Sequence, residues 1–165
     1  MAALTVGKSA PDFTLNTMDG HSFSLREALK TSPVLLAFFK ISCPVCQFAF
    51  PYLERIYKTN RGKGVTIVGV SQNDSKDTAK FLKQFGVTFP VLLDDTKTYP
   101  ASNAYGLTNV PTIFWVSPDG TIEISSVGWV KQEIEQIYLK AAKTNSAPPT
   151  ALFHRDETIA EFRAG

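Results

Sequence analysis

The spacing of hydrophobic positions along the chain predicts strands that alternate with helices. Residues Val34–Phe39 form an unbroken apolar run, which is the pattern of a central strand covered on both faces. Shorter apolar runs predict further strands, over Val65–Val70, Val91–Leu93, Thr112–Val116 and Thr121–Val127. Between and after these strands, apolar residues at helical spacing predict helices, at about residues 44–59, 75–85, 97–105 and 131–142.

The N-terminal part predicts a β-hairpin followed by a short helix. Apolar residues flank Asp19-Gly20 within residues 13–25, as in two strands joined by a turn. Ser24 is a good N-cap and Glu27 follows three residues later, so a helix should begin there and end near Lys30. Strands and helices that alternate and then end in a second hairpin imply an α/β fold with a central mixed sheet and helices on both faces.

Composition and charge indicate a globular protein without a strongly charged partner. The 165 residues are 44% hydrophobic and 19% charged, and the formal net charge is +2. Neither a nucleic acid nor a membrane is therefore an expected partner. The N-terminus has no apolar run of signal-peptide length, and the longest dense run, Pro33–Phe39, is too short to span a bilayer. We expect a soluble, cytoplasmic protein.

The composition changes after Lys143, which divides the chain into two parts. Residues 1–143 carry the predicted strands and helices and should form one domain. Residues 144–165 begin with a linker-like stretch at 145–150 and then carry apolar residues among charges. We expect this second part to be an extended arm that lies on the domain or on a partner. Its apolar residues are Leu152, Phe153, Ile159 and Phe162.

The chain holds two cysteines, Cys43 and Cys46, separated by two residues. A disulfide between them would close a tiny loop and constrain the unfolded chain little. Secreted domains held by disulfides usually carry more cysteines at wider spacings. A chemical role therefore explains this cysteine pair better than a structural disulfide does.

Cys43 lies where a buried strand gives way to a helix. Pro44 suits the first helical position, which makes Cys43 the N-cap. A thiolate there faces free backbone N–H groups and the positive end of the helix dipole, which both favour the charged, nucleophilic form. Cys46 lies about one turn further on and is more sheltered. We expect Cys43 to attack a substrate disulfide and Cys46 to resolve the mixed disulfide. Lys40 either adds positive charge near Cys43 or, as is more usual at a strand end, is simply a solvated lysine.

Other uses of a Cys-x-x-Cys pair fit this sequence less well. Zinc needs four ligands, and the only histidines, His21 and His154, are distant in sequence from the pair. Haem attachment needs a histidine directly after the second cysteine, where Gln47 stands. Two inert core cysteines are unexpected at a strand-to-helix junction that contains Pro44. We expect neither a metal nor another cofactor.

Pro111 opens a predicted strand in the segment Asn109–Phe114. A proline in this place either marks a sheet edge or forms a cis peptide bond that is kept for its geometry. The residues alone leave both alternatives open.

Taken together, these motifs resemble those of the thioredoxin superfamily. The resemblance covers about residues 6–142 and comes first from a Cys-Pro-Val-Cys pair after an apolar strand, a proline in the next helix and a proline before a late strand. Two further stretches are similar to the redoxin branch, which holds TlpA/ResA-type thiol–disulfide oxidoreductases and AhpC/TSA peroxiredoxins. The first three motifs are Cys43–Cys46, Pro51 and Val110–Thr112, and the two further stretches are Ala10–Leu15 and Phe89–Asp94.

The resemblance implies a thioredoxin-like three-layer sandwich and a redox-active dithiol. It implies that Pro111 is cis and packs beside the cysteines, and that the backbone of Val110 pairs with an incoming peptide strand. Pro44 and Val45 would complete the substrate contacts. The implied partners are disulfide-containing or dithiol proteins and a thiol system that donates electrons.

The sequence also departs from the family pattern near the cysteines. Ala37 stands where thioredoxin has a buried aspartate that assists proton transfer, and Gln72 stands where some ResA-like members carry a glutamate. Neither residue can act as a general base. Ser42 replaces the usual tryptophan before the first cysteine. Disulfide exchange remains the expected reaction, with Lys40 and Gln72 as candidate modulators.

Two alternative functions remain open at this point. The first is a thiol peroxidase of the AhpC/TSA type, whose motif is Pro-x-x-x-Thr/Ser-x-x-Cys. Counting back from Cys46 puts Cys43 at the hydroxyl position and Lys40 at the proline position, so two defining residues of that motif are missing. The second alternative is a redox-inactive binding module on the same fold, which would use the C-terminal arm as its contact.

Overall fold

The computed structural model describes residues 2–146 and 150–165, so half of the predicted linker at 145–150 lies outside the described residues. The helices are α1 (Leu25–Leu29), α2 (Pro44–Asn60), α3 (Ser75–Phe85), α4 (Pro100–Ala104) and α5 (Lys131–Thr144). The strands are β1 (Thr14–Thr17), β2 (Ser22–Ser24), β3 (Val34–Phe39), β4 (Thr66–Ser71), β5 (Val91–Leu93), β6 (Thr112–Val116), β7 (Ile122–Val127), β8 (Trp129–Val130) and β9 (Phe162–Arg163).

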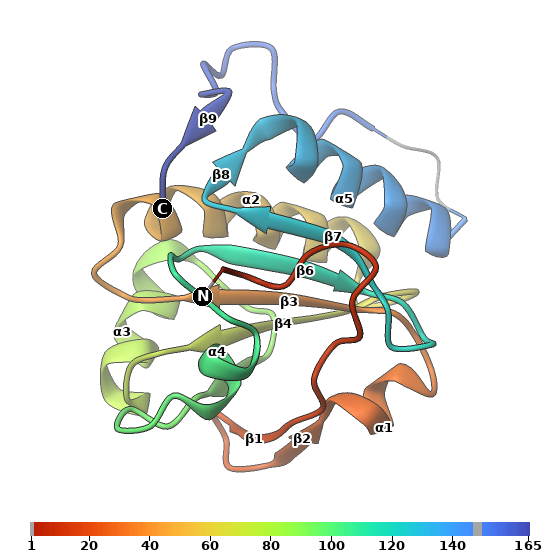
Figure 1. Cartoon of the computed structure of the whole chain (residues 1–165). Helices are drawn as coiled ribbons and strands as arrows, with labels where there is room; N and C mark the ends of the chain where they lie inside the picture. Colours follow the sequence, from red (N-terminus) through yellow and green to blue (C-terminus); the bar gives the residue numbers. More distant parts are fainter. Residues whose placement is uncertain (1, 147–149) are drawn as a thin grey trace.

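Seven strands form a mixed sheet in the order β2-β1-β5-β4-β3-β6-β7. The central strand β3 pairs in parallel with β4 and antiparallel with β6. The predicted N-terminal hairpin is formed by β1 and β2, and it joins the sheet through β5. Residues of α2, α3 and α5 pack in a core on one face of β3, and residues of α1 and α4 pack in a second core on its other face. Figure 1 shows the strands of the sheet stacked from β7 near the top to β1 and β2 at the bottom. The predicted α/β sandwich with helices on both faces is confirmed.

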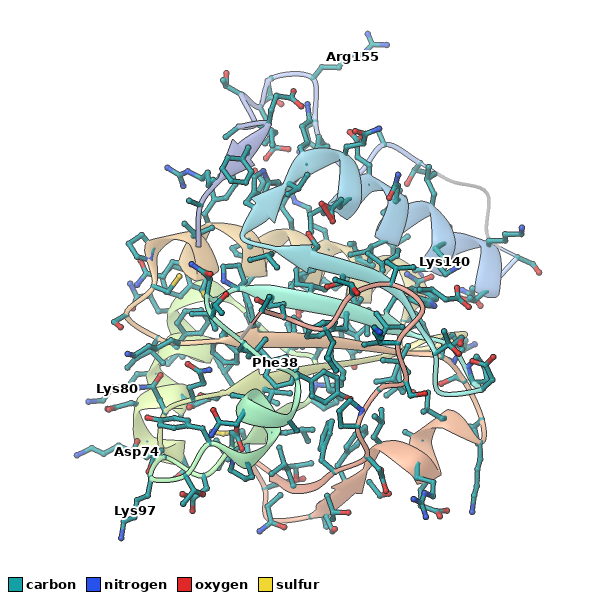
Figure 2. The ribbon with its side chains drawn as sticks, viewed as in Figure 1. Phe38, Asp74, Lys80, Lys97, Lys140 and Arg155 are labelled. Carbon is teal, nitrogen blue, oxygen red and sulfur yellow. The ribbon has the colours of Figure 1, made fainter. Side chains whose placement is uncertain are left out.

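Strand β3 supplies side chains to both cores of the molecule, and all six of its residues are buried. Leu35, Ala37 and Phe39 face a core that includes residues of α2, α3 and α5. The alternate residues, Phe38 among them, face a second core with α1 and α4, and Figure 2 shows Phe38 inside the molecule. Each fully buried leucine or phenylalanine contributes about 1.5–3 kcal/mol, so β3 is firmly held where it leads into the cysteine pair.

Several charged side chains project from the surface at separate places. Lys80, Lys97 and Arg155 project from separate places on the periphery (Figure 2) and are exposed. Asp74 is the N-cap of α3 and accepts a hydrogen bond from the Asp77 amide at 2.8 Å. No helix within residues 2–146 and 150–165 combines the length and the apolar character that crossing a membrane requires.

Helix α4 is shorter than the predicted helix at 97–105, and the local hydrogen bonds explain why. The Asp95 carboxylate accepts from the amides of Lys97 and Thr98, both at 2.8 Å, and so holds this stretch as a turn. Tyr99 follows with φ +47°, a left-handed conformation that a right-handed helix cannot include. The helix therefore begins only at Pro100.

The C-terminal arm lies along the domain of its own chain. Leu152 is buried, and the Trp129 indole N–H donates to the carbonyl of Ala160 at 2.7 Å. The Arg55 guanidinium binds both oxygens of Glu157, at 2.7 and 2.8 Å. The arm then ends in β9, which pairs antiparallel with β8. The sequence predicted neither of these strands, because two residues are too few to show a β periodicity.

Candidate active site

Cys43 is the N-cap of α2, as its position before Pro44 predicts. Its backbone is extended (φ −86°, ψ 114°), and Pro44 lies in the first turn. The Cys46 amide donates to the Cys43 Sγ at 3.2 Å. The sulfur thus takes the place of the oxygen in an ordinary N-cap residue and meets the positive end of the helix.

Cys46 is fully buried one turn into the helix, whereas Cys43 is partly exposed. Burial, and then the hydrogen bond with Cys43, raise the pKa of the Cys46 thiol well above its usual range. Both cysteines are free thiols in this structure. The pair therefore combines one sulfur that a substrate can reach with one that is protonated and sheltered.

Two amide side chains fix the loop that leads into Cys43. The Ile41 amide donates to the Asn73 Oδ1 at 2.9 Å, and the Gln47 Nε2 donates to the Ile41 carbonyl at 2.9 Å. The sequence analysis did not identify Asn73 or Gln47 as site residues. The signal for Asn73 was available, because parallel strands bring their carboxyl ends to one edge of a sheet and Asn73 follows β4, the parallel neighbour of β3.

The peptide bond between Val110 and Pro111 is cis, and it lies beside the cysteine pair. The Cys43 thiol donates to the Val110 carbonyl at 3.3 Å, although 67 residues separate the two in sequence. Pro111 is buried and Val110 is half-buried. The cis bond expected at Pro111 is present and Val110 lies against Cys43, while a role of either residue in binding a peptide stays a prediction.

The remaining predicted residues lie around this centre. Pro44 is exposed at the helix start, and Val45 is half-buried against the core. Lys40 is exposed, and its carbonyl accepts from the Cys43 amide at 3.2 Å. The Gln72 Nε2 donates to the Ser102 Oγ at 3.1 Å. In the described part of the chain, neither the Lys40 nor the Gln72 side chain hydrogen-bonds to a sulfur, so their modulating roles stay predictions.

No cluster of three or more His, Cys, Asp or Glu side chains that could hold a metal ion occurs among the described residues. A cavity of about 410 Å³ beside Leu25 and Arg26 and one of about 450 Å³ beside Val6 and Val127 do not include either cysteine. The chemistry that the site itself offers is that of its two thiols.

Comparison with known proteins agrees with this chemistry. A profile of the AhpC/TSA family matches residues 6–125. The thiol-disulfide oxidoreductase ResA of Bacillus subtilis is 32% identical over 142 residues, which cover 86% of this chain and 78% of that protein.

Two solved structures show the same fold. The thioredoxin domain of a thiol-disulfide oxidoreductase from Bacteroides vulgatus matches with a TM-score of 0.73 and 27% identity, over 83% of this chain and 97% of that one. A thiol:disulfide interchange protein of the thioredoxin family from Chlorobium tepidum matches with a TM-score of 0.67 and 28% identity, over 82% and 96%. The chain therefore belongs to the AhpC/TSA family of thioredoxin-like proteins, and it is a thiol–disulfide oxidoreductase with Cys43 and Cys46 as its dithiol.

Proposed function

We propose that Cys43 attacks the disulfide of a protein substrate and that Cys46 resolves the resulting mixed disulfide. The observation that carries this order is the difference in exposure between the two sulfurs. Cys43 is partly exposed at the N-cap, and Cys46 is fully buried behind it. A substrate disulfide can approach only the first of these sulfurs without unfolding the helix.

The electrons and protons balance over two displacements. In the first, the Cys43 thiolate attacks one substrate sulfur, the substrate S–S bond breaks, and the released substrate thiolate takes up a proton. In the second, the Cys46 thiol gives up its proton and its sulfur attacks the Cys43 sulfur. The S–S bond between Cys43 and the substrate breaks, and the second substrate thiolate leaves and takes up a proton. The substrate gains two electrons, and the Cys43–Cys46 pair becomes a disulfide that a donor dithiol must reduce.

The second displacement should be the slow one. Cys46 has to lose a proton, and burial raises the pKa of its thiol. Ala37, which fills the position of the buried aspartate of thioredoxin, is itself buried and offers no proton acceptor. The mixed disulfide should therefore persist longer than in a thioredoxin, where a buried carboxylate assists the loss of this proton.

The proposed substrates are proteins that present an extended segment to Val110. The backbone of Val110 is half-buried beside Cys43, and its N–H makes no hydrogen bond with another group among the described residues. An incoming strand could pair there while its sulfur lies over Cys43.

The proposed setting is the cytoplasm, where thiols are kept reduced, and the proposed direction is reduction of the substrate by electrons from a cellular thiol system. Equilibration of the dithiol with glutathione mixtures measures its potential and so tests this direction.

The test of the function is reduction of insulin and of glutathione disulfide by the wild type and by the variants Cys43→Ser and Cys46→Ser. We expect the wild type to reduce both substrates and Cys43→Ser to reduce neither. Cys46→Ser should stop after one covalent adduct. Activity that survives in Cys43→Ser would contradict the proposed order. Thiol loss that is faster with hydrogen peroxide than with either disulfide would favour the peroxidase alternative, and no thiol-dependent activity at all would favour the binding module.

A further inference from the structure

The last residues of the chain, Phe162–Gly165, lie against the surface that the proposed function assigns to a peptide substrate. We call these four residues the terminal segment. Its first half is β9, which pairs antiparallel with β8, so that Arg163 faces Trp129 and Phe162 faces Val130. In Figure 1 the ribbon leaves β9 and runs down to the side of α2. The segment thus already adds a strand to β8, beside the helix that carries the cysteines.

Gly165 packs directly on the carbonyl of Val110. A Cβ atom built on Gly165 would lie only 2.5 Å from the Val110 oxygen and 3.0 Å from its carbonyl carbon. The same oxygen accepts the hydrogen bond from the Cys43 thiol at 3.3 Å. The Asn109 Nδ2 donates to the carbonyl of Gly165 at 3.0 Å. The terminal segment therefore covers the backbone with which a peptide strand would pair.

Arg163 adds a contact to the helix that carries the cysteines. Its guanidinium carbon lies 4.6 Å from the centre of the Phe48 ring, within the range of a cation–π interaction. Phe48 in turn packs edge-on against Trp129, with 4.8 Å between the ring centres. An extended chain with a cationic side chain at this position fits the surface between α2 and β8.

The terminal segment is exposed, whereas the arm behind it is anchored by several contacts. All four of its residues are exposed. The preceding part of the arm is tied down by the Arg55–Glu157 pair, by the Trp129–Ala160 hydrogen bond and by the buried Leu152. Such a tether keeps the segment at high effective concentration over its site and still lets a competitor replace it.

We propose that the terminal segment occupies the subsite for an extended polypeptide, so that a protein disulfide must displace the segment before it reacts with Cys43. Small disulfides need no such displacement, because Cys43 remains partly exposed while the segment is in place. This inference rests on the proposed function and adds to it the substrate class and a built-in competitor. The segment itself indicates the kind of substrate: an extended strand with a small residue over Val110 and a cationic residue over Phe48.

The test compares one polypeptide disulfide with one small disulfide. Initial rates of reduction of insulin and of hydroxyethyl disulfide are measured for the wild type, for a chain that stops before Phe162, and for Arg163→Ala. Arg155→Ala is the matched control, because Arg155 lies on the same arm but projects away from the domain (Figure 2). Gly165→Ala is a third variant, since its Cβ would collide with the Val110 backbone.

The truncated chain, Arg163→Ala and Gly165→Ala should reduce insulin at least about threefold faster. The reason is that the apparent affinity for insulin equals the intrinsic affinity multiplied by the fraction of molecules in which the terminal segment is displaced. Hydroxyethyl disulfide should react at the wild-type rate in all of them, which also shows that each variant is folded. Arg155→Ala should match the wild type with both substrates. A matching rise with both substrates, unchanged rates, or slower insulin reduction would each overturn the inference.

The outcomes also separate this inference from the proposed function. If reduction of the small disulfide depends on Cys43 but the rate of insulin reduction is the same with and without the terminal segment, only the inference on the segment is wrong. If neither substrate reacts in the wild type or in the truncated chain, the proposed function itself is wrong.

Discussion

The Cys46 amide donates to the Cys43 Sγ at 3.2 Å, so the resolving cysteine supports the attacking one through its backbone. The two contributions of Cys46 are therefore separable. Its amide holds the Cys43 sulfur at the helix start, and its thiol completes the reaction with that sulfur afterwards. A side-chain substitution at Cys46 removes the second contribution and leaves the first.

This separation predicts that Cys46→Ser retains the attack and loses the resolution. The variant should react with a peptide disulfide at a rate within about threefold of the wild type, because it keeps a donor hydrogen bond of about 0.5–1.5 kcal/mol. It should then accumulate a mixed disulfide on Cys43, which mass spectrometry of the intact protein detects. The matched variant Cys43→Ser should form no adduct, and an adduct on Cys46 in that variant would contradict the assignment of roles.

The second prediction concerns the pH dependence of Cys46. Burial raises the pKa of its thiol above the usual range, and the thiol form predominates below that pKa. In Cys43→Ser, alkylation of Cys46 by iodoacetamide should therefore be slow at pH 7 and rise about tenfold per pH unit without a plateau through pH 9. The rate is followed by mass spectrometry, with the urea-unfolded chain as the control. A plateau below pH 9 in the folded protein would contradict this prediction.

The third prediction concerns the tether of the arm. The Arg55 guanidinium, and then the His154 amide, lower the pKa of Glu157 from 4.5 to about 2. Because the folded-state pKa is the lower one, the stabilisation is complete above about pH 4.5 and is lost as the pH falls towards 2. In urea unfolding, the stability difference between wild type and Glu157→Gln should shrink over this range. Glu161→Gln, on the same arm but more exposed, serves as the control, and a difference that stays constant from pH 6 to pH 3 would exclude this role for Glu157.

The fourth prediction concerns a buried carboxylate that no step of the reaction uses. Glu54 in α2 accepts from the Thr88 amide at 2.7 Å, the Thr88 hydroxyl at 2.5 Å and the Phe89 amide at 3.3 Å. Glu54→Ala leaves these donors unpaired and should lower the free energy of unfolding by about 2–3 kcal/mol, measured with urea. The exposed Glu135 is the control, since Glu135→Ala should change stability by less than about 0.5 kcal/mol. Equal effects of the two substitutions would contradict the structural role of Glu54.

The sequence predicts best the parts of the site that local patterns determine. The apolar run of β3 and the proline after Cys43 are enough to predict a buried strand, a helix start and a sulfur at the N-cap, and all three are present. The cis bond before Pro111 follows only from the resemblance to a family, because an isolated proline before a strand is also compatible with a sheet edge.

What the sequence could not predict depends on contacts between distant residues. Arg55 and Glu157 are 102 residues apart, and neither position carries a local signal of pairing. Strands β8 and β9 have two residues each and show no periodicity. Asn109 and Gly165 meet because the arm folds back over α2, which no pattern within the arm specifies. The position of the arm next to the active site therefore required the three-dimensional structure.

The burial of both faces of β3 has a consequence for how motion is distributed in the molecule. The amides of this strand can exchange their hydrogens with solvent only when the whole sheet opens, so they should be among the slowest to exchange. The exposed residues after Glu161 can exchange through small local openings. Cys43 thus follows the strand whose amides exchange most slowly. A bulky substrate is accommodated by local opening of the exposed residues after Glu161.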